Sequence, residues 1–290
     1  MVTGAAQIHL LDKGRVMAEY GPMQLVISAV VGEVPQVEEC VRAAKESFCY
    51  LGQVAKQLKR LSLPWHRISN SIEGRVASDM VAASRAVGDR DLTPMAAVAG
   101  AIADAVADFL LARGMSRVVV SNGGDVAVRL AVDCSVQVGI GININRTRYG
   151  NLPTLVLDSS RPRWGVASSG LGGRSMTKGI ASIVTVVSDT AARADAAATA
   201  VANATYVEDP EIKRVRAEAL DPNTDIPGQL VTLKVGRISN EKIGSALRRG
   251  KARAYDLIEE GVISGALIVV KDRLEAIGTL FRLEETQELH

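Results

Sequence analysis

An alanine-rich segment in the second half of the chain carries three polar side chains at helical spacing. Residues 193–205 read RADAAATAVANAT, and because seven of these thirteen residues are alanine, a helix is expected. Asp195, Thr199 and Asn203 are four residues apart and would share one face of that helix. A carboxylate one turn from a hydroxyl supplies oxygen ligands of the kind that Mg²⁺ prefers. The spacing leaves two interpretations equally open: a solvent-facing polar stripe, or a metal site at Asp195 and Thr199.

A second segment could hold a ligand against bare backbone. SNGGDVAV, residues 121–128, lies between two runs rich in β-branched residues, and Asn122, Gly123 and Gly124 all tolerate positive φ. The pattern slightly favours a simple hairpin turn. In the functional interpretation the glycines let a ligand approach the backbone, and the turn orients Asp125.

A third segment, VASSGLGGRSMTKG at residues 166–179, combines glycines and serines with Arg174 and Lys178. Such a loop can present amide N–H groups and cations to a phosphate group. It is not a P-loop, because the GxxxxGK[ST] pattern is missing. A plain surface loop and a phosphate-binding loop carry equal weight.

The elements that must position these residues follow from periodicity and from turn signals. Strands are predicted at 23–32, in three adjacent runs over 117–144, and at 154–160, 163–169, 180–188, 230–236, 265–270 and 274–283. Helices are predicted at 37–61, 74–88, 94–113, 190–206, 208–220 and 241–261.

Strands grouped together, with long helices between the groups, predict an α+β fold. The three runs over 117–144 are expected to be antiparallel neighbours in one sheet, with the 94–113 helix packed across it. We expect a single domain over residues 1–290, in which residues from about 228 to 290 could form an α/β subregion.

The composition excludes several classes of function. A net charge of +2 and an aromatic content of 3% argue against nucleic acid as a partner. Cys40, Cys49 and Cys134 show no CxxC spacing and are expected to be reduced thiols. The N-terminus lacks the pattern of a signal peptide, and charges interrupt every long apolar stretch, so a cytoplasmic protein without a membrane partner is expected.

In their order along the chain, these segments resemble the ApbE-like superfamily, whose best-known members are FAD-dependent flavin transferases. The resemblance is carried by SNGGDVAV, by VASSG and by SIVTVVSDTAARADAAATA, which is similar to that family's strand followed by its ADxxxT helix. GAIADAV, residues 100–106, is similar to a family G-x-x-x-D segment and puts Asp104 at the matching position. The match covers roughly residues 90–205, and four elements recur in order.

The resemblance implies an α+β fold, mostly antiparallel sheet with packed helices, and FAD or a related pyrophosphate nucleotide as the small-molecule partner. It implies Mg²⁺ near Asp195 and Thr199, where the ion would bridge the pyrophosphate. The implied nucleotide-binding residues are Asn122, Gly123, Gly124, Asp125, Ser169, Gly170 and Asp104, with Arg174 and Lys178 as candidates for phosphate neutralisation.

The sequence departs from the family pattern in two places. Transferases of the family carry a lysine immediately before the G-x-x-x-D segment, and this chain has Ala99 there. They also carry an H-x-x-D-P-x-T-G element after the Ser-Gly loop, to which the resemblance assigns proton abstraction from the acceptor hydroxyl. Here the corresponding stretch is LGGRSMTKGIA, without His or Asp.

Because general-base assistance contributes about 10²–10⁴-fold in rate, its loss bears directly on the reaction. The expected function is therefore binding of FAD or a related nucleotide with Mg²⁺, with FMN transfer as the candidate reaction. Two alternatives stay open: a non-catalytic flavin or nucleotide carrier, and an ApbE-like enzyme with a changed reaction. The sequence leaves the acceptor and the oligomeric state open, with a homodimer as one option.

Overall fold

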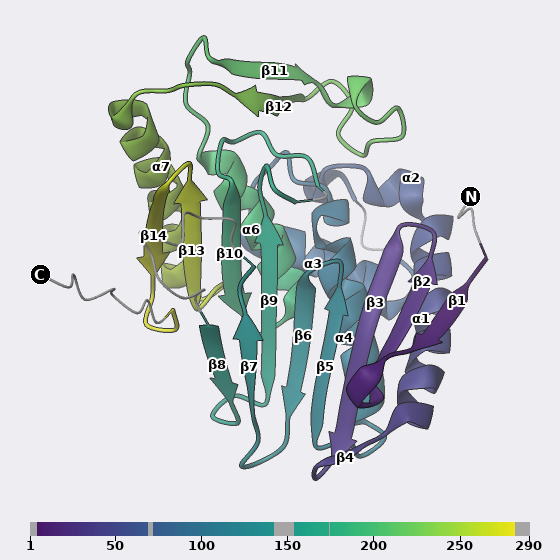
Figure 1. Cartoon of the computed structure of the whole chain (residues 1–290). Helices are drawn as coiled ribbons and strands as arrows, with labels where there is room; N and C mark the ends of the chain where they lie inside the picture. The colour runs from purple at the N-terminus through teal and green to yellow at the C-terminus, as the bar shows by residue number, and fades with distance from the viewer. Residues whose placement is uncertain (1–4, 69–71, 142–153, 174, 282–290) are drawn as a thin grey trace, which may run out of the picture.

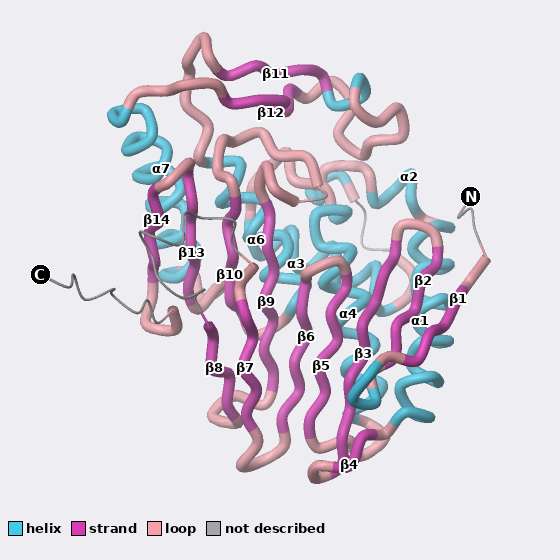
Figure 2. The backbone as a smooth tube through the Cα atoms, viewed as in Figure 1, coloured by secondary structure: helices cyan, strands magenta, loops and turns pink. Residues whose placement is uncertain are grey.

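In the computed structural model, which describes residues 5–68, 72–141, 154–173 and 175–281, the helices lie against one face of a large sheet (Figures 1 and 2). The strands are β1 (Gln7–Leu10), β2 (Val16–Tyr20), β3 (Met23–Val31), β4 (Val34–Pro35), β5 (Arg117–Asn122), β6 (Asp125–Leu130), β7 (Ser135–Gly139), β8 (Thr154–Asp158), β9 (Arg163–Ser169), β10 (Ile183–Ser188), β11 (Ile212–Arg216), β12 (Leu230–Val235), β13 (Gly265–Val270) and β14 (Arg273–Ile277).

The main sheet runs in the order β1-β2-β3-β5-β6-β9-β10-β13-β14, with β4 paired to β3. Every neighbouring pair is antiparallel. The prediction of an α+β fold with a mostly antiparallel sheet is confirmed. Strands β1 and β2, which the sequence pattern does not predict, form one edge of this sheet.

The helices are α1 (Val37–Lys56), α2 (Leu58–Leu61), α3 (Arg75–Val87), α4 (Val98–Leu111), α6 (Ala191–Ala204) and α7 (Asn240–Glu259). Alternation along the strands explains how they pack: Met23, Leu25, Ile27 and Ala29 of β3 are buried against the helices, and the residues between them are not. A short 3₁₀ helix, Pro94–Ala97, leads into α4. By length and apolar composition Pro94–Leu111 could cross a membrane, but 67% of it is buried inside the fold, as expected for a core helix.

The opposite face of the sheet is covered by a separate hairpin, β7–β8. Leu155 and Leu157 of β8 pack with Val128 and Trp164 of the main sheet in a second apolar core. The prediction that all three runs over 117–144 are neighbours in one sheet is therefore wrong for the third run; its residues beyond 141 lie outside the described ranges. A half-buried strand alternates in the same way in either sheet, so the sequence pattern could not distinguish them.

The predicted helix over 208–220 is also wrong. Ile212–Arg216 is strand β11, paired with β12, and a 3₁₀ turn follows at Ala217–Ala219. The pair forms a small sheet beyond one end of the main sheet (Figure 1). Thr232 of β12 donates its backbone N–H to the Thr177 carbonyl at 2.8 Å. This bond connects the pair to the segment SGLGGRSMTKG, residues 169–179, which we call the Gly-rich loop. Pairing with a distant partner outweighs the weak helical preference of so short a segment.

Helix α6 occupies the centre of the molecule, which explains its alanine content. It contacts β9, β10, α3, α4 and α7. A Cβ built at Gly100 of α4 would lie 2.2 Å from the Ala191 carbonyl oxygen, and one at Gly165 of β9 would lie 2.1 Å from the Thr190 carbonyl carbon. Such close approach requires small side chains on both sides, so the helix has no solvent-facing half.

The first turns of α4 and α6 are held together by two exchanged carboxylates. Asp195 of α6 accepts a hydrogen bond from the Gly100 N–H at 3.0 Å, and Asp104 of α4 accepts one from the Ala192 N–H at 2.9 Å. The first N–H groups of a helix have no partner within it, and the helix dipole favours negative charge there. Each helix therefore caps the other.

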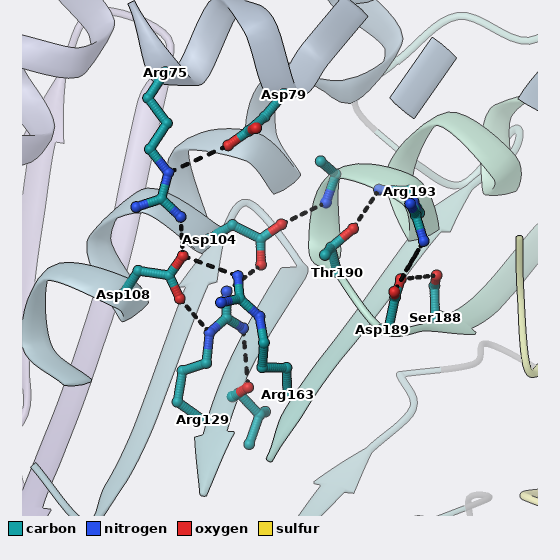
Figure 3. Close-up of polar contacts among 12 residues, drawn as sticks. Arg75, Asp79, Asp104, Asp108, Arg129, Arg163, Ser188, Asp189, Thr190 and Arg193 are labelled. Atoms are coloured by element: carbon teal, nitrogen blue, oxygen red, sulfur yellow. Dashed lines mark hydrogen bonds and ion pairs between the residues drawn. The ribbon is translucent and has the colours of Figure 1, made fainter. Parts of the chain in front are cut away.

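Asp104 belongs to a buried ionic network, shown in Figure 3. Arg129 of β6, fully buried, donates to Asp104 at 2.8 Å and to Asp108 at 2.6 Å. Arg163 of β9 and Arg75 of α3 also reach Asp108. These contacts lower the pKa of Asp108 against the opposing effect of burial. The network ties the sheet to α3 and α4.

We propose that the described part of the C-terminal region, residues 228–281, belongs to the same domain as the rest of the chain. β13 pairs with β10, which places the C-terminal strands within the main sheet, and α7 packs on both β13 and α6.

Replacing Gly100 by Ala tests the close contact between α4 and α6. Because the added Cβ meets backbone atoms that cannot rotate away, Gly100→Ala should lower the free energy of unfolding by about 1–3 kcal/mol. The control is Gly52→Ala in α1, where nothing lies within 4 Å of the new Cβ, and it should raise stability by up to about 1 kcal/mol. Urea denaturation measures both; equal effects would contradict the proposed close packing.

Arg129→Met tests the ionic network. Two buried carboxylates would lose their principal cation, so the free energy of unfolding should fall by about 3–5 kcal/mol. Arg75→Met removes an arginine from the same network, but its side chain is 58% exposed, and the expected loss is at most about 1 kcal/mol. Similar losses for the two variants in denaturant titrations would show that burial does not determine the strength of these pairs.

Candidate functional site: a groove with two facing carboxylates

Three adjoining cavities form one groove along the surface where α6, the β5–β6 turn and the Gly-rich loop meet. The smallest, about 250 Å³, lies in the middle. It shares Gly123 and Ser168 with a cavity of about 510 Å³ on one side. On the other side it shares Thr199 and Ser175 with a cavity of about 410 Å³. We call these three cavities the central groove; their sizes are those of small-molecule sites.

The segment SNGGDVAV forms the predicted hairpin turn and also lines the groove. Asn122 ends β5 and pairs with Asp125, which begins β6, while Gly123 and Gly124 have φ of 64° and 117°. Only glycine adopts both conformations without strain. The buried Asn122 side chain donates to the Ala99 carbonyl at 3.1 Å. The two interpretations of this segment are thus compatible, since the turn itself forms part of the wall.

Asp125 and Asp195 both line the middle cavity. Removal from bulk water raises the pKa of Asp125 to about 7, against a hydrogen bond from the Ser168 N–H that lowers it. The pKa of Asp195 is raised well above its usual range, first by desolvation and then by the negative charge of Asp125. Its bonds to the N–H groups of Ala99 and Gly100 oppose the shift without cancelling it. Two such carboxylates side by side attract either a proton or a cation.

The polar line along α6 is neither solvent-facing nor uniform in role. Thr199 lines both the middle and the 410 Å³ cavity, next to Asp195. Asn203 lines only the 410 Å³ cavity, and its amide oxygen accepts from the Lys178 N–H at 2.8 Å and from the Thr177 hydroxyl at 3.3 Å. Asn203 therefore anchors the Gly-rich loop, while Asp195 and Thr199 face the groove.

The Gly-rich loop forms the wall of the 510 Å³ cavity. A Cβ at Gly170, which has φ of 132°, would meet the Ala181 and Ser182 carbonyl oxygens at 2.9 Å. Ser169 is 3% exposed, and its hydroxyl oxygen has no hydrogen-bond partner among the described residues. A buried hydroxyl without a partner beside a cavity is available to a ligand.

Of the two cations predicted to bind phosphate, the structure describes Lys178. Lys178 lines the 410 Å³ cavity and forms an ion pair with Asp91. Arg174 lies outside the described residues.

Asp104, also predicted as a nucleotide-binding residue, lines none of the three cavities. Both of its carboxylate oxygens accept hydrogen bonds within the fold, from Arg129 and from the Ala192 N–H.

Sequence reasoning missed part of the groove. The loop between β11 and β12 contributes Asp221, Asn223, Thr224, Asp225, Ile226 and Gln229 to the 410 Å³ cavity. Asp225 is held there by the Thr93 hydroxyl. Nothing in the spacing of residues 91–95 and 221–229 signals that they meet, because the contact depends on how the β11–β12 pair is placed.

The donor set of the middle cavity fits a magnesium ion in part. Asp125, Asp195 and Thr199 offer the hard oxygen ligands that Mg²⁺ takes. In the described ranges no three His, Cys, Asp or Glu side chains gather closely enough to form a complete metal site. Mg²⁺ commonly uses one or two carboxylates and completes its shell with water and substrate phosphate.

The raised pKa of Asp125 predicts how stability depends on pH. In the folded protein this group binds its proton up to about pH 7, whereas the unfolded chain releases it near pH 4. Stability from this group is therefore present at low pH and is lost as the pH rises through that window.

In EDTA, the free energy of unfolding should be lower at pH 8 than at pH 5, and Asp125→Asn should reduce this difference and leave the part that Asp195 contributes. Denaturant titrations at both pH values measure it. An unchanged slope in the variant would mean that Asp125 titrates normally.

The sequence matches a known protein family along most of its length. The family model described as "AbpE bacteria" matches residues 8–277. A UPF0280 protein of Methanobrevibacter smithii is 31% identical over 201 residues, which is 69% of this chain and 68% of that protein. A UPF0280 protein of Methanopyrus kandleri is 40% identical over 154 residues, 52% of this chain and 58% of the relative, so the second match spans less than two thirds of its partner.

Among solved structures, the chain is similar to the apo form of the flavinyl transferase ApbE of Pseudomonas stutzeri, with 15% identity, a TM-score of 0.46 and 97% and 96% of the two chains covered. The flavin transferase ApbE of Vibrio cholerae shows 15% identity and a TM-score of 0.37, with 82% and 74% covered. The match of the family model along nearly the whole fold is decisive: the chain belongs to the AbpE bacteria family, as a divergent ApbE-like member.

Proposed function

We propose that this protein binds FAD, or a related pyrophosphate nucleotide, together with Mg²⁺ in the central groove. The observation that carries the proposal is the pair Asp125 and Asp195, two desolvated carboxylates beside Thr199 at the point where the three cavities join. The family membership makes a flavin nucleotide the ligand to test first.

In this proposal Asp195, Thr199 and Asp125 hold the metal, which neutralises the charge of the pyrophosphate when bound. A metal is needed for this because the groove itself offers little free positive charge. In the described part of the groove the lining cation is Lys178, and its charge is already paired with Asp91. The Gly123–Gly124 turn supplies a bare backbone bed, and Ser169 supplies a hydroxyl without a partner. Asp104 acts at a distance, by holding α6 in place.

Transfer of FMN would require the acceptor hydroxyl oxygen to bond to the FMN phosphorus while the bond to AMP breaks, and the hydroxyl proton needs an acceptor. Between Gly170 and Ser188 the sequence has no histidine or aspartate for that task. We therefore propose that binding is retained while transfer is slow. This departure favours a second candidate, a non-catalytic flavin or nucleotide carrier. We place either activity in the cytoplasm, since Cys40, Cys49 and Cys134 are free thiols.

Asp195→Ala and Thr199→Val test the metal site. Calorimetry of FAD binding, with millimolar Mg²⁺ or with EDTA, should show metal-dependent affinity in the wild type and at least about tenfold weaker binding with Mg²⁺ in each variant. Asp195→Ala also removes a helix cap and should lose about 0.5–2 kcal/mol of stability, whereas Thr199→Val separates the metal from the cap. Asp189→Ala is the matched control, because this exposed aspartate pairs with Arg193 outside the groove.

Equal FAD affinity with Mg²⁺ and with EDTA would remove the metal from the proposal, and no binding of flavin or adenine nucleotide would remove the ligand. Incubation of the protein with FAD, Mg²⁺ and a threonine-containing acceptor then separates the candidates. Rapid release of AMP with covalent flavin, followed by mass spectrometry, would identify a transferase in which another group replaces the missing base. FAD binding without AMP release would support the carrier or a changed reaction.

A further inference from the structure

Helix α7 carries five cations, which fall into two groups with different surroundings: Lys242, Arg249 and Arg253, and Arg248 and Lys251. Lys242 donates to the Glu208 carbonyl at 2.6 Å and Arg249 to the Tyr206 carbonyl at 2.7 Å. Arg253 bonds to Asp89 at 2.9 Å. These three cations brace the helix against the rest of the fold. Arg248 and Lys251 point elsewhere, into a cavity between α7 and β14.

This cavity has a volume of about 420 Å³ and a strongly basic lining. Arg248 and Lys251 come from α7, and Arg273 and Glu275 come from β14. Glu275 pairs with Lys251 at 3.3 Å. Arg248 and Arg273 have no carboxylate partner in the described part of the chain, so the three cations and one carboxylate of the described lining carry a net charge of +2.

The cavity is separate from the central groove. It shares no lining residue with any of the three groove cavities. It is lined in part by β14, the last strand at the C-terminal edge of the main sheet (Figure 1). The groove is lined by residues of α6 and of the β5–β6 turn. A ligand here would not compete with one in the groove.

We propose that the cavity between α7 and β14 is an anion site for a small molecule carrying a phosphate or pyrophosphate group. Guanidinium groups present planar, paired N–H donors that match phosphate oxygens, and they remain charged at every physiological pH. Two of them, from adjacent elements, can hold one anion from two sides. The apolar side chains of Leu247 and Leu274 extend the lining beyond the charged groups, and the volume accommodates more than one phosphate group.

Binding of inorganic pyrophosphate in EDTA tests the site, because EDTA removes the metal on which the proposed groove ligand depends. Calorimetry at low salt should show binding to the wild type and at least about tenfold weaker binding to Arg248→Gln/Arg273→Gln. Lys45→Gln/Lys56→Gln removes the same charge from the exposed surface of α1 and should bind as the wild type does. Asp195→Ala should also retain binding, which separates this site from the groove.

Chemical modification of the wild type gives a second readout that does not depend on a variant folding. Pyrophosphate should slow the reaction of phenylglyoxal with Arg248 and Arg273, mapped by mass spectrometry, and should leave exposed Arg85 unaffected. The proposal fails if the wild type does not bind millimolar pyrophosphate, if the arginine double variant binds within twofold of the wild type, or if Asp195→Ala abolishes binding. If FAD does not bind in the central groove while pyrophosphate still binds between α7 and β14, only the proposed function is contradicted.

Discussion

The contact between the first turns of α4 and α6 determines both the core and the groove. Gly100 lies against the Ala191 carbonyl, and Asp195 and Asp104 each cap the other helix. A helix packed this closely on several sides can carry little but alanine, and a polar residue is tolerated only where it meets a partner or a cavity. The polar residues of the alanine-rich segment occupy such places: Asp195 the cap and the groove, Thr199 the groove, and Asn203 the Gly-rich loop.

Two pairs of carboxylates near this contact differ in whether a cation neutralises them. Asp104 and Asp108 form ion pairs with arginines, which neutralise their charge within the fold (Figure 3). The arginines are Arg129, Arg163 and Arg75. Asp125 and Asp195 line the same cavity, and burial raises the pKa of each. Matched charges hold a structure together, whereas desolvated, unmatched ones mark a place where a cation or a proton is required. We base the proposed metal site on this difference between the two pairs of carboxylates.

This chain retains one part of the family pattern and lacks another part. The glycine turn, the Ser-Gly loop and the Asp195–Thr199 pair form one continuous groove. The lysine before the G-x-x-x-D segment and the His/Asp element of the transferases are absent from the sequence. Binding and proton transfer depend on different residues, so a chain can keep a ligand bed after the base has gone.

The sequence by itself determined the class of the fold and identified eight of the residues that line the groove, among them Asp125, Asp195 and Thr199. Local signals sufficed there: Asn-Gly-Gly-Asp specifies a two-residue hairpin turn, i to i+4 spacing aligns Asp195 with Thr199, and alternation identifies strands such as β3. The helix 94–113 was recognisable for the same reason, from its Thr-Pro start and its glycine stop.

Tertiary structure alone decided the rest, because pairing between distant segments has no local signature. It placed β7 in a separate hairpin and made a strand of the segment predicted as a helix at 208–220, which brought the β11–β12 loop into the groove. It turned Asp104 towards Arg129 and Ala192, away from a ligand, and set Asp125 against Asp195. Spacing along a chain fixes which side chains share a face, but burial and charge depend on what packs against that face.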